Sequence, residues 1–302
     1  MEHKSRCSPK HVLARIGFEF SGNYKLGSGR YSKVYKGYYR DGERYLAIKV
    51  IDLEQISTEF RQKFLPRELS VWKQLDHKNH VFLYKEFERF GYQFSIMELA
   101  SDGDMLSYVQ SKGPVSETSS REWMMQLIDA IAYMHQKEIA HRDLKLENIL
   151  LFDGGILKIA DYGFCKQSID LASTFCGSKS YSAPEILRGV VYDPFKADIW
   201  SLGVIGYIML TNTMPFREDV DNIEIVDSQR HRRYRYSSKL GLSSECKSAI
   251  DKMMTFDAKH RPNIYQCAQL EWFTTPRVPK IYDAKRRRPS VSNYTSQNFK
   301  IG

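Results

Sequence analysis

The stretch HRDLKLEN, residues 141–148, decides how the rest of this sequence is interpreted. It fits the pattern H-R-D-L-x-x-x-N at every specified position. Asp143 can take or orient the proton of an attacking hydroxyl group, and Lys145 can offset negative charge that develops on a transferring group. Asn148 offers an amide oxygen, the kind of ligand that a hard cation such as Mg²⁺ prefers. The octapeptide therefore predicts a catalytic loop with Asp143 as its carboxylate.

Two shorter motifs follow the octapeptide in the chain. The tripeptide DYG, residues 161–163, comes directly after a segment that resembles the end of a strand, and Asp161 is a second candidate ligand for Mg²⁺ beside Asn148. The tripeptide APE, residues 183–185, closes the segment that begins at Asp161. Neither tripeptide is informative alone, but their order and spacing after residues 141–148 support one common site.

Two further signals precede the octapeptide. Residues 26–34, LGSGRYSKV, hold glycines that let a hairpin approach phosphate groups, although the third glycine of G-x-G-x-x-G is Ser32 and an ordinary turn remains an alternative. A dinucleotide-binding turn would be followed by a helix, whereas residues 34–39 read as another strand. Lys49 either reaches solvent from a strand end or, paired with Glu68 on the next helix, contacts α- and β-phosphates.

The predicted secondary structure changes along the chain. Residues 18–99 are mainly strand-like, whereas residues 104–273 are mainly helical, which predicts an α+β protein with two lobes. The polar segment 1–17 and the basic segment 274–302 are predicted to be flexible. Within the lobes we expect helices around 62–74, from 104, at 123–135 and over 199–210, antiparallel strands between 18 and 47, and strands at 94–99 and within 150–159.

Composition excludes several classes of protein. Of 302 residues 42% are hydrophobic, and the five cysteines form no C-x-x-C pair, so a disulfide framework or zinc site is not expected. No signal peptide is visible, and the longest apolar stretch, 199–210, is too short to cross a bilayer. The net charge of +9 comes partly from clusters at 230–235 and 285–288, which lack the aromatic interleaving of a nucleic-acid platform. We expect a cytoplasmic protein that binds neither membrane nor nucleic acid.

With these motifs in order, residues 18–273 resemble the eukaryotic protein kinase superfamily. The resemblance implies a bilobal fold that binds ATP and Mg²⁺, with Met97 as gatekeeper. Catalysis would involve Lys49, Glu68, Asp143, Lys145 and Asn148, and the metal would be held by Asn148 and Asp161. The resemblance also implies a nucleotide site made of Leu26, Gly27, Ser28, Gly29, Arg30, Tyr31, Ser32, Lys33, Val34, Ala47, Lys49, Glu98, Ala100 and Asp104.

The same resemblance assigns structural roles. Asp198 would brace the catalytic loop, Glu185 and Arg261 would form a buried ion pair, and the hydroxyl of Ser178 would help to hold Asp143 and Lys145. Tyr162 departs from the pattern, because phenylalanine is usual between Asp161 and Gly163. A buried tyrosine needs a partner for its hydroxyl.

Within the superfamily, the chain is most similar to the testis-specific serine/threonine kinases of the calmodulin-dependent kinase-like group. The segments that carry this similarity are 64–68, 97–100 and 173–178. Lys145, at its spacing from Asp143, is typical of serine/threonine kinases. The resemblance implies protein substrates and a role in sperm development or function.

Regulation and partners are predicted from single positions. Thr174 is the candidate activation site, phosphorylated by an upstream kinase or by the chain itself. The alternative is an ordinary loop threonine. Glu147 and Asp104 favour a basophilic substrate preference. Arg287-Arg288-Pro289-Ser290 resembles a basophilic phosphosite, although a solvated basic tail is the simpler interpretation, and residues 285–288 also suggest nuclear import. We expect a monomer.

Two rival functions remain at this point. A pseudokinase scaffold would keep the fold without turnover, but such proteins usually lack one of the catalytic residues, and all of them are present here. A basic nucleic-acid-binding protein is favoured only by the net charge of +9.

Overall fold

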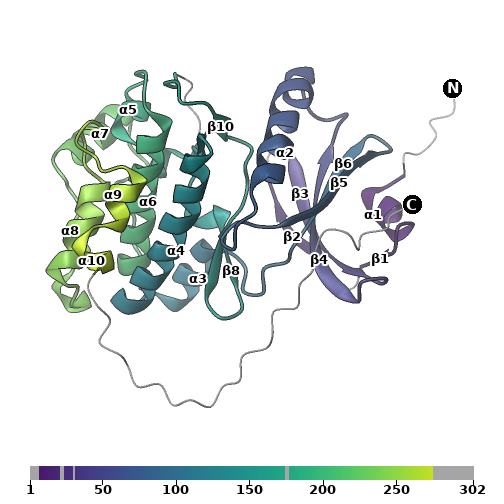
Figure 1. Ribbon diagram of the computed structural model, residues 1–302, viewed down its shortest axis with the longest axis horizontal. Helices are drawn as coiled ribbons and strands as arrows, with labels where there is room; N and C mark the ends of the chain where they lie inside the picture. The colour runs from purple at the N-terminus through teal and green to yellow at the C-terminus, as the bar shows by residue number, and fades with distance from the viewer. Residues whose placement is uncertain (1–6, 21–23, 30, 174–176, 275–302) are drawn as a thin grey trace, which may run out of the picture. The chain divides into compact units, whose positions relative to one another are not determined.

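The computed structural model describes residues 7–20, 24–29, 31–173 and 177–274. The chain divides into two compact units, and each is described by itself. Unit 1 consists of residues up to Thr58 together with Phe82–Leu99, and unit 2 consists of Glu59–Val81 and Ala100–Thr274. A β-rich part of the chain is followed by a mainly helical part, which confirms the α+β prediction (Figure 1).

Residues 59–81, which we assigned from the sequence to the first lobe, belong to unit 2. The reason is a backbone connection to a distant strand. The N–H of Ile159 donates to the carbonyl of Asn79 at 2.9 Å, and the N–H of Val81 donates to the carbonyl of Ile159 at 3.0 Å. Such pairing between segments far apart in sequence is invisible to a reading of local periodicity.

Unit 1 is built on an antiparallel sheet. Within the described residues, six strands pair in the order β1-β3-β4-β6-β5, with β2 beside β3. The predicted succession of antiparallel strands is thereby confirmed. The strands are β1 (Phe18–Glu19), β2 (Lys25–Ser28), β3 (Ser32–Tyr39), β4 (Arg44–Asp52), β5 (Leu83–Arg89) and β6 (Tyr92–Met97).

A short helix, α1 (Pro9–Ala14), precedes the sheet, so the prediction that residues 1–17 are flexible is wrong for this part of the chain. Ser8 caps the helix by accepting the N–H of His11, and Pro9 occupies its first turn, where the missing N–H costs nothing. Val12 and Leu13 are each 1% exposed. The helix therefore joins the core of unit 1 through two neighbouring apolar residues, too few to give a periodic signal.

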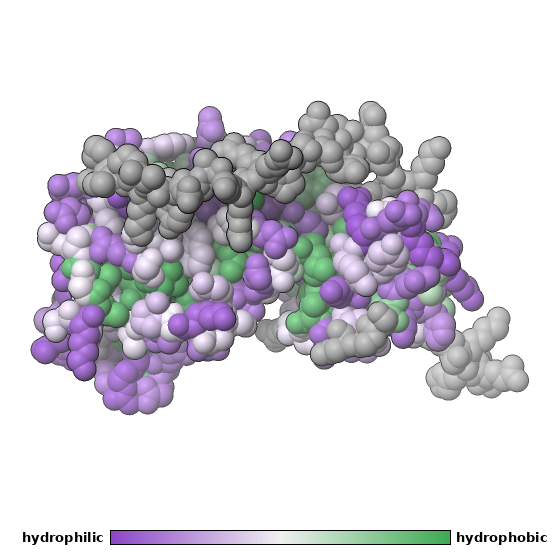
Figure 2. All heavy atoms as spheres, turned by 90° about the horizontal axis from the view of Figure 1, so that it is seen from below, coloured by the Kyte–Doolittle hydropathy of each residue, from purple (hydrophilic) through white to green (hydrophobic). Residues whose placement is uncertain are grey.

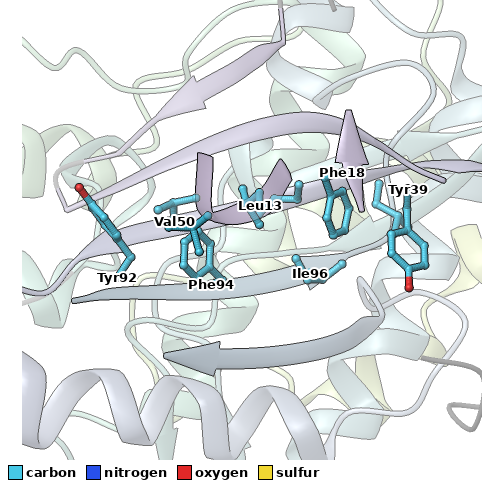
Figure 3. Packing of buried hydrophobic residues seen from close by; sticks show 10 residues of the cluster. Leu13, Phe18, Tyr39, Val50, Tyr92, Phe94 and Ile96 are labelled. Atoms are coloured by element: carbon cyan, nitrogen blue, oxygen red, sulfur yellow. The ribbon is translucent and has the colours of Figure 1, made fainter. Parts of the chain in front are cut away.

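The core that α1 joins lies on one face of the sheet. Figure 3 shows Leu13 among side chains from β1, β3, β4 and β6. Its buried members are Val12, Leu13, Phe18, Tyr39, Leu46, Ile48, Val50, Tyr92, Phe94 and Ile96. Burial of this apolar surface is the main term that stabilises unit 1.

Unit 2 is mainly helical. Its helices are α2 (Leu65–Gln74), α3 (Met105–Lys112), α4 (Glu117–Gln136), α5 (Pro184–Leu187), α6 (Pro194–Thr211), α7 (Asn222–Arg230), α8 (Ser244–Met253), α9 (Ile264–Ala268) and α10 (Glu271–Thr274). A π-helical turn, Phe60–Phe64, leads into α2, and short 3₁₀ turns lie at Leu146–Asn148, Lys179–Tyr181 and Ser238–Leu240. Two strand pairs complete it: β7 (Ile139–Ala140) with β10 (Lys166–Gln167), and β8 (Ile149–Phe152) with β9 (Ile156–Ile159).

The helix α6 contains the apolar stretch 199–210, and the prediction of a buried helix there is confirmed. Two glycines inside it permit close packing against α8. A Cβ atom at Gly203 would lie 2.9 Å from Cβ of Met253, and one at Gly206 would lie 2.6 Å from Cδ1 of Ile250. Glycine is therefore retained here for proximity, at a cost in helix propensity of about 1 kcal/mol per position.

The surface is mixed in character. On the face drawn in Figure 2, hydrophilic residues in purple form much of the coloured surface, with smaller hydrophobic areas in green between them. Among the described residues, no helix combines the length and the apolarity that crossing a bilayer requires.

Candidate active site

Asp143 is held by a network of hydrogen bonds in unit 2. Its Oδ1 accepts the N–H of Ser178 at 3.0 Å and the hydroxyl of Ser178 at 3.2 Å. Its Oδ2 lies 3.2 Å from Nζ of Lys145 and accepts Nδ2 of Asn148 at 3.2 Å. Lys145 also donates to the hydroxyl oxygen of Ser178 at 3.0 Å, as the predicted role of Ser178 requires. Asp143 is 5% exposed, so a largely desolvated carboxylate lies beside one ammonium group.

The segment before Ser178 approaches the catalytic loop closely. Gly177 has φ +88°, a conformation that side-chain-bearing residues rarely adopt. A Cβ atom at this position would lie 2.6 Å from the carbonyl oxygen of Arg142 and 3.3 Å from Oδ1 of Asp143. Only glycine therefore lets this segment bring Ser178 against the catalytic carboxylate.

Asp198 on α6 holds the catalytic loop through hydrogen bonds to its backbone. The carboxylate accepts the N–H of His141 at 2.9 Å and the N–H of Arg142 at 2.8 Å, and Nε2 of His135 lies 2.9 Å away. Arg142 has φ +65°, a left-handed conformation that a non-glycine residue holds only when its surroundings impose it. The predicted bracing role of Asp198 is confirmed, and it explains how the strained turn persists.

Asn148 and Asp161, the two candidate oxygen donors for a metal ion, lie on segments that a backbone hydrogen bond joins. Asn148 uses Nδ2 to donate to the carbonyl of Asp143 at 2.9 Å, which leaves its amide oxygen as a possible ligand. Its own carbonyl accepts the N–H of Ala160, the residue before Asp161, at 2.8 Å. A Cβ atom at Gly163 would lie 3.5 Å from Oδ1 of Asp161, an ordinary contact distance.

An amide oxygen and a carboxylate suit Mg²⁺, which usually takes one or two protein carboxylates and completes its shell with water and substrate phosphates. The described residues contain no group of three or more His, Cys, Asp and Glu side chains placed for a metal. The donor set at Asn148 and Asp161 fits this preference of Mg²⁺.

Glu68 lies on α2 and is 4% exposed. Its Oε2 would lie 3.4 Å from a Cβ atom at Gly163, so it approaches the DYG segment within unit 2. Lys49 lies on β4 in unit 1. Because the two residues belong to different units, their pairing stays a prediction.

The predicted phosphate loop is a hairpin in unit 1. β2 and β3 pair up to Ser28 and Lys33, and the N–H of Gly29 donates to the carbonyl of Ser32 at 2.8 Å. Leu26, Gly27 and Ser28 lie on β2, Ser32, Lys33 and Val34 lie on β3, Gly29 and Tyr31 lie in the turn, and Arg30 lies outside the described residues. Ala47 lies two residues before Lys49 on β4. The strand that follows the turn excludes a dinucleotide-binding strand–turn–helix here.

The predicted hinge lies where β6 ends. Its backbone and side chain are tied to the start of β5, since the N–H of Glu98 donates to the carbonyl of Phe82 at 3.1 Å and Oε1 of Glu98 accepts the N–H of Phe82 at 2.7 Å. The chain then passes to Ala100 in unit 2.

Asp104, predicted to contact the nucleotide or a basic substrate, has a structural role that was not predicted from the sequence. It caps α3, with Oδ1 accepting the N–H and Oδ2 accepting the hydroxyl of Ser107, both at 2.9 Å. The pattern D-x-x-S, with two apolar residues directly after the aspartate, is a helix-start signal that was available in the sequence.

The segment that begins at Asp161 and closes with APE, residues 183–185, is the activation segment. Its residues 174–176, and therefore Thr174, lie outside the described residues. Within the described part of the segment, the carbonyl of Phe164 accepts Nε of Arg142 at 2.7 Å. At the end of the segment, Arg261 forms a bidentate ion pair with Glu185, at 2.7 and 3.1 Å, as predicted. Arg261 is 1% exposed, so this pair is part of the core of unit 2.

Tyr162, the departure from the usual phenylalanine, is 1% exposed, and its hydroxyl has partners. It donates to the carbonyl of Ile159 at 2.7 Å and lies 3.2 Å from Nδ1 of His80. No pattern in the sequence links Tyr162 to His80, which lies 82 residues away in the chain.

Comparison with known proteins supports this assembly. The protein kinase domain family matches residues 20–273. Testis-specific serine/threonine-protein kinase 3 of Mus musculus is 38% identical over 85% of this chain and 98% of its own length. Testis-specific serine/threonine-protein kinase 2 of Mus musculus is 35% identical over 94% of this chain and 80% of its own length. Serine/threonine-protein kinase SIK1 of Rattus norvegicus is 33% identical over 93% of this chain and 36% of its own length. This chain therefore belongs to the protein kinase family, on the branch of serine/threonine kinases that holds these relatives.

Proposed function

We propose that this chain is an active enzyme that transfers the γ-phosphoryl group of ATP to serine or threonine hydroxyls of proteins. The observation that carries the proposal is the arrangement at Asp143, whose carboxylate is bonded to Ser178 and accompanied by Lys145 and Asn148. A pseudokinase has no need to keep every one of these contacts. Their presence favours turnover over a purely structural role.

In the reaction we propose, Asp143 orients the substrate hydroxyl and accepts its proton as the oxygen bonds to phosphorus. The bond between the γ-phosphorus and the bridging oxygen breaks, and its electrons leave with ADP. Lys145, 3.2 Å from the Asp143 carboxylate, offsets negative charge on the transferring group. Mg²⁺, when bound by Asn148 and Asp161, neutralises charge on the phosphates of the nucleotide.

For the nucleotide we propose the residues that the sequence indicates. The hairpin from Leu26 to Val34 would cover the phosphates, and Ala47 with the backbone from Glu98 to Ala100 would meet the adenine ring. Lys49, held by Glu68, would contact the α- and β-phosphates. The ribose or a basic substrate residue would meet Asp104, whose two carboxylate oxygens already accept bonds from Ser107.

A transfer assay tests the proposal. The purified chain is incubated with Mg-ATP and a basic peptide that holds a single serine, and the Lys49→Ala variant serves as control. We expect transfer by the parent chain and a loss of at least about 100-fold in the variant, since removing one group that stabilises transition-state charge typically costs that much. Equal transfer by both, or none by a parent chain that carries phosphate at Thr174, would favour the pseudokinase.

We propose Thr174 as the activating phosphosite. A phosphate there carries nearly two negative charges and would attract the guanidinium of Arg142, which otherwise donates to the carbonyl of Phe164. The Thr174→Ala variant is expected to lose about 10-fold or more in turnover, consistent with the loss of one to three charge-assisted hydrogen bonds of about 1.5 to 3 kcal/mol each. Steady-state kinetics on phosphorylated parent and variant, with Ser173→Ala as control, measure the effect. Unchanged turnover in Thr174→Ala would refute the assignment.

We further propose a preference for basic substrates. Glu147 accepts the hydroxyl of Tyr181 at 3.4 Å and is exposed, so it remains available to a cationic side chain near the catalytic carboxylate. Ser290, after Arg287-Arg288-Pro289, would then be a substrate within the same chain.

The names of the relatives support a role in sperm development or function. We propose a cytoplasmic location, with nuclear import through residues 285–288 as the weaker alternative.

A further inference from the structure

A series of polar contacts crosses the interior of unit 2. The carbonyl of Ala130 on α4 lies 3.1 Å from Nε2 of His80, and Nδ1 of His80 lies 3.2 Å from the hydroxyl of Tyr162. That hydroxyl donates to the carbonyl of Ile159 at 2.7 Å. His80 and Tyr162 are 2% and 1% exposed. Buried polar groups are kept only with partners, and these two side chains are partners of each other.

The positions of the hydrogen atoms follow from the acceptors. A carbonyl oxygen only accepts, so Nε2 of His80 carries a hydrogen and donates it to Ala130. Burial lowers the pKa of His80 to about 3, which keeps the imidazole neutral and makes Nδ1 an acceptor. The single hydrogen of the Tyr162 hydroxyl is then shared between two acceptors, the carbonyl of Ile159 at 2.7 Å and, more weakly, Nδ1 of His80 at 3.2 Å. A phenylalanine would leave Nδ1 without this donor.

These contacts tie down both sides of Asp161. On one side, Ile159 is fixed by backbone hydrogen bonds to Asn79 and Val81. On the other side, the ring of Tyr162 is tied back to the carbonyl of Ile159 through its hydroxyl. Asp161 between them has φ +62°, a conformation that persists only where the surroundings enforce it.

Packing alone would also hold a ring at this position. The ring of Tyr162 lies 5.6 Å from that of Trp72 and 5.9 Å from that of His141, measured between centroids. Phenylalanine would keep these contacts but would lose the bond that closes the turn around Asp161. The effect of the hydroxyl is therefore separable from that of the ring.

We propose that the hydroxyl of Tyr162, oriented by His80, is a positioning group that holds the carboxylate of Asp161 ready for Mg²⁺. The inference rests on the proposed function, in which Asp161 is a metal ligand. Groups that orient a metal ligand typically change metal affinity by about 10- to 100-fold when removed. The hydroxyl lies on the residue next to the ligand, so we expect the lower end of that range.

The test compares the full chain with Tyr162→Phe, His80→Leu and the double variant. ADP in excess is added at rising Mg²⁺ concentrations, and thermal unfolding gives the Mg²⁺ concentration at half-maximal stabilisation. We expect this concentration to rise about 10-fold in Tyr162→Phe. In His80→Leu the hydroxyl keeps Ile159, so a smaller rise is expected.

The double variant separates positioning from packing. Without nucleotide, its unfolding temperature should recover toward that of the parent, because neither buried polar group remains to lack a partner. Its Mg²⁺ requirement should stay raised, because the tie to Ile159 is still missing. Tyr207→Phe is the matched control, since the hydroxyl of Tyr207 is also bonded to a backbone carbonyl, that of Arg235, at 2.8 Å. Its Mg²⁺ requirement should equal that of the parent.

Two results would overturn the inference while leaving the proposed function in place. One is an unchanged Mg²⁺ requirement in Tyr162→Phe. The other is a requirement that recovers in the double variant together with its unfolding temperature, which would assign the pair to packing alone. A parent chain that Mg²⁺ and ADP do not stabilise would overturn the proposed function itself, and the inference with it.

Discussion

Replacing Asp143 with asparagine is expected to lower kcat by about 10²- to 10⁴-fold, the range associated with loss of a general base. Asparagine keeps the size of the side chain but cannot take the proton of the substrate hydroxyl. It also places an amide near Lys145 and Ser178, both of which donate to the carboxylate of Asp143 in the parent chain. The binding of ADP, which does not require proton transfer, should change little.

Single-turnover kinetics at saturating Mg-ATP measure the loss, and thermal unfolding in the presence of ADP checks that the variant is folded. Asp153→Asn makes the same chemical change at an exposed position in the turn between β8 and β9, and it should leave the rate unaltered. A variant at Asp143 that kept more than a tenth of the parent rate would remove this residue from the reaction.

Gly177→Ala is expected to cost about 100-fold in turnover, although it adds a single methyl group. The backbone at φ +88° disfavours alanine, and the new Cβ would lie 2.6 Å from the carbonyl of Arg142. Backbone atoms cannot swing aside as the end of a long side chain can, so the segment must move. Ser178 moves with it, and a displacement of about 1 Å at a reacting group can cost 10²-fold in rate.

Gly154→Ala provides the matched control for that prediction. Gly154 has φ +76°, and an added Cβ would meet nothing within 4 Å. Alanine there carries a similar backbone penalty without the clash, so it should reduce thermal stability modestly and leave kcat intact. If both alanine variants lost activity equally, general strain rather than displacement of Ser178 would be the cause.

The sequence predicted the proximity of the side chains around Asp143 because they lie in one short motif. Asp143, Lys145 and Asn148 share one loop, and the geometry of that loop is a local property of the chain. The contacts of Ser178 and Asp198 were predicted through the family resemblance. Neither follows from spacing, since these residues lie 35 and 56 positions from the loop residues that they contact.

Other parts were beyond prediction for physical reasons. The partnership of His80 and Tyr162 depends on two buried side chains meeting in three dimensions, and no periodicity encodes it. The helix α1 has six residues, which is shorter than the length at which a repeating apolar pattern can be recognised. Isolated helices of that length are unstable in water, so α1 depends on the sheet against which it packs.

That dependence is mutual, and it separates the family match from the unit that folds. The match begins at residue 20, after both α1 and β1. A chain started there would lose Val12, Leu13 and Phe18 from the core. It would also open the side of β3 that β1 covers at Tyr38 and Tyr39, while β4 still pairs with the other side. An uncovered apolar face and an open sheet edge in the same place invite other chains to bind. Such a fragment would therefore aggregate on expression, even though every catalytic residue is still present.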